Sequence, residues 1–228
     1  MYHNSAVSKK SRRSPGSRPL AVLLLGPTGS GKSPLGAAAA LSGLWGRRAF
    51  HFDFGENLRR AAAGRGPDRF RLGRAGRTVI RRSLATGALL EDEHFPIAGR
   101  IFEGFLRVSC VRPGDLIILN GLPRHAGQAR EMDRLVAVVA VVQLVAAPAV
   151  VRERIRRDAG GDRKGRRDDS LTEIRQKLDI YQARTRPLVE HYRNNGAAVI
   201  TLGVGACTTA DMMRKRLERS GAIALFTP

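Results

Sequence analysis

A glycine-rich segment near the start of the chain has the residue types and spacing of a phosphate-binding loop. Residues 26–33 read GPTGSGKS and fill every fixed position of the pattern G-x-x-x-x-G-K-[ST]. The glycines let successive backbone N–H groups turn inward around phosphate oxygens, and the start of a following helix would add partial positive charge. Lys32 can reach the β- and γ-phosphates of a nucleotide, and the Ser33 hydroxyl can ligate Mg²⁺. The segment therefore predicts a site for a nucleotide with its metal ion.

The segments around this loop are those that such a site needs. An apolar run at residues 20–25 predicts a buried strand that enters the loop, and an alanine-rich stretch from Lys32 predicts the helix that leaves it. Further strands are predicted at residues 49–53, 116–119, 138–145 and 198–202. Because helical patterns alternate with these strands, we expect an α/β protein of the P-loop three-layer type, with a five-stranded parallel sheet and helices on both faces.

The best-defined helix follows Ser170. Ser170 and Glu173 have the spacing of a capping box, and an apolar stripe at three- and four-residue steps continues to Tyr192. Pro187 is expected to kink the end of this helix. The arginine- and glycine-rich stretch 64–76 lacks a clear period and is expected to be a loop or an insertion. Shorter helices are predicted at residues 56–63, 78–85 and 94–110.

Length, composition and charge suit one domain. The chain has 228 residues, 43% of them apolar, and a formal net charge of +20. Residues 1–19 are basic, rich in Ser, Pro and Gly, and without apolar periodicity, so we expect a disordered tail before a single domain at 20–228. The positive charge has three readings: genomic base composition, a site for polyphosphate, or nucleic-acid binding. With eight Phe, three Tyr and one Trp, the chain offers little base-stacking surface, which disfavours nucleic acid as a partner.

The cysteines and the most apolar stretch bear on the compartment. Cys110 and Cys207 cannot make a four-ligand zinc site, and we interpret them as buried thiols in a reducing, cytoplasmic compartment. The apolar stretch 135–151 contains Gln143 and Pro148 and is short for a membrane span. A buried parallel strand that runs into a helix explains it better. We expect a monomer with no membrane contact.

Three further segments, together with the phosphate loop, resemble the adenylate kinase family from residue 20 to about residue 217. Residues 55–59, GENLR, resemble the family's G-D-x-L-R segment. Residues 121–124, GLPR, with Gln128 four residues on, resemble its D-G-F-P-R…Q signature, and residues 165–169, GRRDD, resemble its R-x-D-D segment. The spacing between the four motifs also fits the family. The resemblance implies Mg²⁺-dependent transfer of the γ-phosphoryl group of ATP to a nucleoside monophosphate, with AMP as the first expectation.

The resemblance also implies roles for the matching residues. Those implied to bind ATP are Gly29, Ser30, Gly31, Lys32, Ser33 and Arg154. Those implied to bind the acceptor monophosphate are Arg59, Gly121, Arg124 and Gln128. Those implied to be catalytic, as cations for the transferring phosphoryl group, are Lys32, Arg124, Arg166 and Lys177. In the family, the residue at Arg154 packs on the adenine of ATP, and the one at Gln128 hydrogen-bonds the acceptor adenine. An acceptor-binding insertion would span about 54–90, and a short zinc-free lid about 157–167.

Four positions depart from the family pattern. Asn120 stands where the family has an aspartate that helps hold Mg²⁺ through water, so the expected metal set is Ser33 with Asn120, which lacks the charge. Pro34 replaces a threonine and removes one backbone N–H near the phosphates, and Lys177 replaces an arginine. Phe54 stands where a small hydroxyl residue is usual near the acceptor base. These changes motivate an alternative: a nucleotide-binding protein of this family with weakened catalysis, acting through its basic surface.

Overall fold

The computed structural model describes residues 18–65, 72–161 and 170–220. One sheet of five parallel strands has the order β2-β3-β1-β4-β5. Its strands are β1 (Leu20–Leu25), β2 (Ala49–Asp53), β3 (Leu116–Asn120), β4 (Ala137–Val145) and β5 (Ala198–Gly203). The predicted fold class is confirmed, and each strand ends within about one residue of its predicted limits, because runs of apolar residues mark strands that are buried on both faces.

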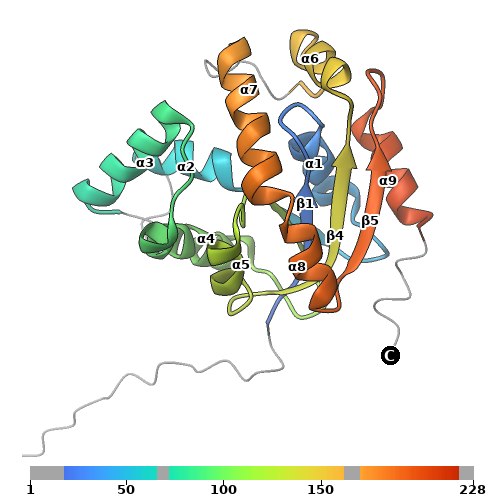
Figure 1. Cartoon of the computed structure of the whole chain (residues 1–228). Coiled ribbons are helices and arrows are strands. Elements are labelled where there is room, and N and C mark those ends of the chain that lie inside the picture. Colours follow the sequence, from blue (N-terminus) through green and yellow to red (C-terminus); the bar gives the residue numbers. More distant parts are fainter. Residues whose placement is uncertain (1–17, 66–71, 162–169, 221–228) are drawn as a thin grey trace, which may run out of the picture.

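Helical segments connect the strands and cover the sheet. They are α1 (Lys32–Ser42), α2 (Phe54–Ala62), α3 (Arg74–Thr86), the 3₁₀ turn η3 (Asp92–His94), α4 (Phe95–Ser109), α5 (Ala126–Met132), α6 (Pro148–Arg156), α7 (Leu171–Ile180), the π-helical segment η4 (Tyr181–Thr185), α8 (Leu188–Asn194) and α9 (Ala210–Glu218). In Figure 1, α2 and α3 lie to the side of the sheet, while α6 and α7 lie toward the ends to which the strand arrows point.

Side chains of the central strand β1 alternate between two apolar clusters. Ala21, Leu23 and Leu25 are buried in a cluster with α4, α5 and α8, whereas Val22 and Leu24 are buried in a second cluster with α1 and α9. This alternation is the two-residue period of a strand. Helices therefore pack on both faces of the sheet, as Figure 1 shows, and the three-layer architecture follows.

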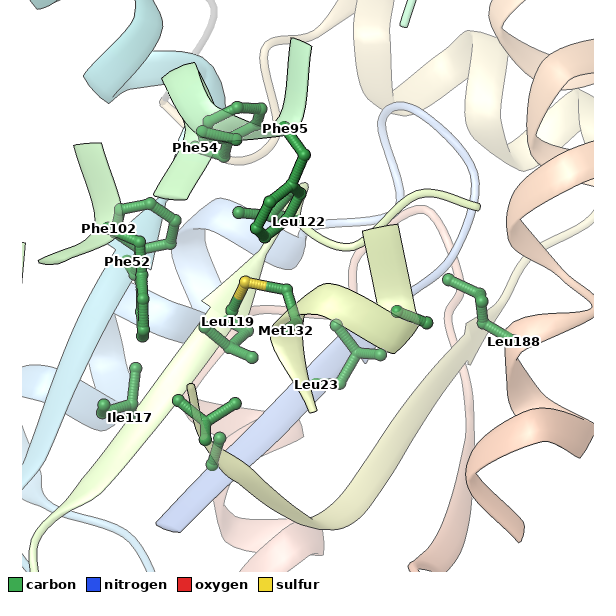
Figure 2. Packing of buried hydrophobic residues seen from close by; sticks show 14 of the residues in the cluster. Leu23, Phe52, Phe54, Phe95, Phe102, Ile117, Leu119, Leu122, Met132 and Leu188 are labelled. Atoms are coloured by element: carbon green, nitrogen blue, oxygen red, sulfur yellow. The ribbon is translucent and has the colours of Figure 1, made fainter. Parts of the chain in front are cut away.

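Aromatic packing fixes the end of β2. The ring of Phe52 lies 5.0 Å from that of Phe102, edge to face, and 6.0 Å from that of Phe54. Figure 2 shows these three rings together in the first cluster. Because Phe52 and Phe54 are both buried there, the residue between them, Asp53, faces the opposite side, toward the phosphate loop.

Two helical regions differ from the sequence prediction. Helix α3 begins at Arg74, inside the stretch 64–76 in which no helical period was found, and the N–H of Arg77 donates to the carbonyl of Gly73 at 3.1 Å. The helix after Ser170 has the predicted capping box, but it widens into η4 before Pro187 instead of only kinking there. Pro187 has no N–H to continue the α-helical pattern, and the N–H of Arg186 donates to the carbonyl of Tyr181, five residues back, at 2.8 Å.

The expectation of buried thiols is wrong, because Cys110 and Cys207 are both exposed. Cys110 ends α4 in a left-handed conformation with φ 49°, and Cys207 lies in the loop between β5 and α9. The apolar stretch 135–151, by contrast, forms β4 and the start of α6 as predicted. Within the described residues, no helix has the length and apolar character that crossing a bilayer would require.

Candidate functional site

A cavity of about 250 Å³ lies at the carboxyl ends of β1, β2 and β3. The predicted site residues that line it are Gly29, Gly31, Lys32, Ser33, Arg59, Asn120, Gly121, Arg124, Gln128, Arg154 and Lys177. Open parallel sheets bind ligands at this edge. Ser30 is buried beneath the phosphate loop and does not line the cavity. Arg166, with most of the predicted lid, lies outside the described residues.

The backbone of the phosphate loop depends on glycine. Gly29 and Gly31 have φ values of 74° and 96°, in the left-handed region that L side chains rarely adopt. A Cβ atom on Gly29 would also lie 2.7 Å from a side-chain carbon of Ile155 in α6. Beneath the loop, the hydroxyl of Ser30 donates to the carbonyl of Pro27 at 2.8 Å. Backbone conformation, close packing and this hydrogen bond together hold the loop in shape.

The side chain of Lys32 folds back over the phosphate loop. Its Nζ atom donates to the carbonyls of Gly26 and Pro27 at 2.8 and 2.7 Å. Lys32 is the first residue of α1, so the positive end of that helix points into the same cavity. The ammonium group and the helix start both favour an anion there.

Arg154 joins the phosphate loop to the loop between β5 and α9. Its side chain is 3% exposed, and its Nε atom donates to the carbonyl of Gly29 at 3.1 Å. Its Nη1 atom donates to the carbonyls of Gly205, Ala206 and Thr208 at 2.9, 3.3 and 2.8 Å. Arg154 therefore braces the loop and also lines the cavity, while its contact with adenine stays a prediction.

The ends of β2 and β3 meet the phosphate loop in a polar network. The hydroxyl of Ser33 donates to Oδ2 of Asp53 at 2.6 Å, and Nδ2 of Asn120 lies 3.0 Å from Oγ of Ser33 and 2.9 Å from Oδ2 of Asp53. Burial alone would raise the pKa of Asp53, but hydrogen bonds from Ser33 and from the N–H of Glu56, together with the nearby charges of His51 and Arg59, outweigh it, and the pKa lies below its ordinary value. The site therefore carries an ionised carboxylate that the sequence analysis did not select.

Arg124 is the cation of the β3–α5 loop. It is partly buried and lines the cavity, and burial, with a smaller contribution from Arg184, lowers its pKa to about 10. Among the described residues, no carboxylate or carbonyl pairs with its guanidinium group. Arg59 of α2 lines the same cavity and is exposed. The two arginines thus present charge to a shared space, which suits a phosphate.

Gln128 is almost completely buried, at 1% exposed, and is held by the backbone. Its Oε1 atom accepts the N–H of Arg124, and its Nε2 atom donates to the carbonyl of Leu90, both at 2.8 Å. His125 also reaches that carbonyl through Nε2 at 3.0 Å, while its Nδ1 atom caps α5 by accepting the N–H of Gln128. One N–H of the Gln128 amide and one lone pair of its oxygen have no part in these two bonds.

The segment that carries Lys177 is tied to the acceptor side of the cavity. The hydroxyl of Thr185 in η4 donates to the carbonyl of Arg124 at 2.8 Å. Arg184 makes a two-pronged ion pair with Glu91, at 2.5 and 2.7 Å, which joins η4 to the chain after α3. Lys177 and Thr185 both line the cavity, so these ties set where the cation of α7 lies.

The sequence did not lead us to predict Asp53, or the ion pair and the hydrogen bond that hold η4 in place. A signal for Asp53 was present: it ends a predicted strand just before the helix that carries Arg59, and its carboxylate follows an apolar run. The ends of neighbouring parallel strands share one sheet edge, so a charged residue there is a candidate for the site. No comparable signal marks Leu90, whose backbone carbonyl holds Gln128, or Thr185, whose hydroxyl holds the carbonyl of Arg124.

A parallel sheet in this order, with a phosphate loop after its central strand and a cavity at its carboxyl edge, defines a P-loop nucleotide-binding protein. No family model matches the chain. Curated proteins named adenylate kinase are similar to it: that of Stenotrophomonas maltophilia (strain K279a) is 33% identical over 192 residues, which are 81% of this chain and 91% of the relative. For Xanthomonas campestris pv. campestris (strain B100) the identity is 33% over 204 residues, 87% of this chain and 97% of the relative. The chain belongs to the adenylate kinase family of nucleoside monophosphate kinases.

Proposed function

We propose that the protein transfers the γ-phosphoryl group of ATP to a nucleoside monophosphate, with AMP as the preferred acceptor and Mg²⁺ bound with the ATP. The observation that carries this proposal is the shared cavity, which Lys32 and the phosphate loop line on one side and Arg59 and Arg124 on the other. A site that only bound ATP would need the first side alone. Two groups of cations in one cavity suit two phosphates that face each other.

The residues act by positioning and by neutralising charge, which is most of what phosphoryl transfer requires. Lys32 would exchange its bonds to the loop carbonyls for bonds to phosphate oxygens. Arg124, with Arg59, would bind the acceptor phosphate and hold its attacking oxygen toward the γ-phosphate. Lys177 would balance negative charge on the phosphoryl group during transfer, and Arg166 would do the same, as the family pattern implies.

The chemistry of the polar network suits Mg²⁺. The Ser33 hydroxyl and the Asp53 carboxylate are oxygen donors at the edge of the phosphate loop. Mg²⁺ in kinases keeps several waters and binds through one or two carboxylates together with substrate phosphates. When bound, the ion would neutralise charge on the phosphates of ATP.

The preference for AMP rests on Gln128. Its amide is fixed by the N–H of Arg124 and the carbonyl of Leu90, and it lines the cavity beside the arginine expected to bind the acceptor phosphate. The remaining N–H and lone pair can serve one edge of a purine base. Because the backbone fixes this amide, it can select a base without first losing side-chain freedom.

The weakened, nucleotide-binding alternative receives less support. Pro34 is the third residue of α1, where a backbone N–H has no partner within the helix, so its absence costs the helix nothing and removes only one of the donors near the phosphate loop. Asn120 lies beside the carboxylate of Asp53, so a negative charge is still present next to the end of β3. The monomeric state, the cytoplasmic location and the insertion and lid boundaries stay predictions from the sequence.

The deciding experiment is a coupled assay of ADP formation from ATP and a panel of nucleoside monophosphates. We expect turnover well above background, highest with AMP, and lost in Lys32→Ala. Tight binding of nucleotide or RNA without turnover on any monophosphate would favour the alternative. A different preferred acceptor would retain the kinase and reject the role of Gln128 in base selection.

A further inference from the structure

Asp53 occupies a position that joins the two residues expected to serve the metal. It is the last residue of β2, and it pairs in register with Asn120, the last residue of β3. Its Oδ2 atom accepts the hydroxyl of Ser33 at 2.6 Å and Nδ2 of Asn120 at 2.9 Å. It also lines the cavity that the phosphate loop enters.

This network orients the hydroxyl of Ser33. A serine hydroxyl has one proton and two lone pairs. The proton is directed to Asp53, and Asn120 donates to one lone pair of Oγ at 3.0 Å. Within the described residues, the second lone pair is not used by these bonds, so Ser33 can present an oxygen to a cation without losing either partner.

Asn120 takes part as a donor. Its Nδ2 atom faces both Ser33 and Asp53, so its amide nitrogen, and not its oxygen, meets the network. An aspartate at position 120, as in the family pattern, would bring a second carboxylate within hydrogen-bond distance of Asp53, and like charges that close repel each other. The charge that β3 lacks therefore lies one strand away, on β2.

We propose that Asp53 supplies the carboxylate that holds the water shell of the ATP-bound Mg²⁺, in place of the aspartate that the family pattern has at position 120. The proposal rests on the proposed function, because it takes Mg²⁺ and ATP to occupy the phosphate loop. A carboxylate in register with Asn120 and bonded to Ser33 lies beside the metal set already expected from the sequence. Asp53 restores the negative charge that the expected metal set lacks, but it places this charge on β2 and not at position 120 on β3.

Asp53 also has a structural role, which the experiment must separate. Its Oδ1 atom accepts the N–H of Glu56 at 2.9 Å and caps α2. Asparagine caps helices about as well as aspartate, so Asp53→Asn removes the charge and keeps the cap. Glu56→Gln is the matched control, because it removes an exposed negative charge three residues away without altering the side chains of Ser33 or Asn120.

The test uses the full chain with ATP and measures Mn²⁺ binding, in place of Mg²⁺, by electron paramagnetic resonance of the unbound ion. For Asp53→Asn we expect the Mn²⁺ dissociation constant to rise roughly 10- to 100-fold, as for other outer-shell partners of metals, while ATP affinity in EDTA changes little. Glu56→Gln should change neither quantity. The double variant Asp53→Asn/Asn120→Asp moves the carboxylate to β3 at constant charge, and it should recover most of the Mn²⁺ affinity.

Unchanged Mn²⁺ affinity in a folded Asp53→Asn protein would overturn the proposal. Should that variant fail to fold, Asp53→Ser takes its place, because serine also caps a helix and carries no charge: a raised Mn²⁺ dissociation constant supports the proposal, and an unchanged one rejects it. The proposed function fails separately: a wild type that transfers no phosphoryl group, yet binds Mn²⁺ with ATP through Asp53, would reject the kinase and retain the assignment of Asp53.

Discussion

Replacing Arg124 with methionine should make the protein more stable and remove its use of an acceptor. The folded state holds the guanidinium of Arg124 partly buried, and its pKa falls from 12.5 to about 10. A fall of that size corresponds to roughly 3 kcal/mol spent on keeping the charge in the cavity. Methionine fills similar space without charge, so Arg124→Met should recover part of this free energy.

We expect the free energy of unfolding of Arg124→Met to rise by about 1–3 kcal/mol, which for a domain of this size raises the melting temperature by roughly 2–4 °C per kcal/mol. In the coupled assay, kcat/KM for the acceptor should fall by at least about 100-fold, because hydrogen bonds to charged groups contribute about 1.5–3 kcal/mol each. The dissociation constant of ATP should stay close to that of the wild type. Arg130→Met, on the exposed face of α5, is the control and should change none of these quantities appreciably.

The result that would refute this reasoning is an Arg124→Met protein that melts below the wild type and loses affinity for ATP and acceptor alike. Arg124 would then hold the fold through its side chain and would not be poised for a phosphate. A smaller gain in stability than expected, with acceptor use lost, would mean that solvent already screens the charge of Arg124 in the cavity.

Three further outcomes follow from other contacts. Gly29→Ala should abolish ATP binding, measured by calorimetry, because a Cβ there would lie 2.7 Å from the side chain of Ile155 in α6. Gly46→Ala is the control: Gly46 has a similar φ of 70° but open space around it, so thermal melting should show a loss of only about 1 kcal/mol of stability. Burial lowers the pKa of His51 below 6.5, so below that pH the unfolded chain binds more protons than the folded one. The free energy of unfolding should therefore be at its full value above about pH 6.5 and fall as the pH drops, by at most about 1.4 kcal/mol per pH unit. Urea unfolding across this pH range should show the loss in the wild type and not in His51→Gln. Thr185→Val removes the hydrogen bond to the carbonyl of Arg124, about 1 kcal/mol, and should raise the KM of the acceptor roughly fivefold with the KM of ATP unchanged.

The sequence predicted those parts of the fold that follow from local pattern. Strands buried on both faces are continuous apolar runs, so the runs at 20–25 and 49–53 matched the structure at both ends. The start of α3 did not follow, because Gly73 and Gly76 read as loop residues although the helix includes the second of them. Propensity is a weak guide where tertiary packing supports a helix, and Ile80 of α3 is completely buried in the first apolar cluster.

The candidate site was predictable where a motif fixes spacing along the chain, and not where it depends on pairing between strands. The phosphate loop and Arg124 follow from consecutive residues, and both line the cavity. Asp53 ends a predicted strand and so could have been selected, but its bonds to Ser33 and Asn120 follow from the register of β2 against β3, which no local pattern contains. The exposure of Cys110 likewise depends on how much of the end of α4 the rest of the fold covers, which no local pattern contains.

The π-helical segment η4 sets the rotational phase of α7. A π turn contains about one residue more than an α turn, and an α-helix advances about 100° per residue. Deleting one residue between Tyr181 and Thr185 would restore a regular helix and turn α7 by roughly that angle relative to α8, which would carry Lys177 off the cavity while leaving its sequence unchanged. The number of residues in η4 therefore determines which side of α7 faces the cavity. In any comparison with a relative that lacks this widened turn, a gap belongs within η4, because placing it elsewhere would align side chains that point in different directions.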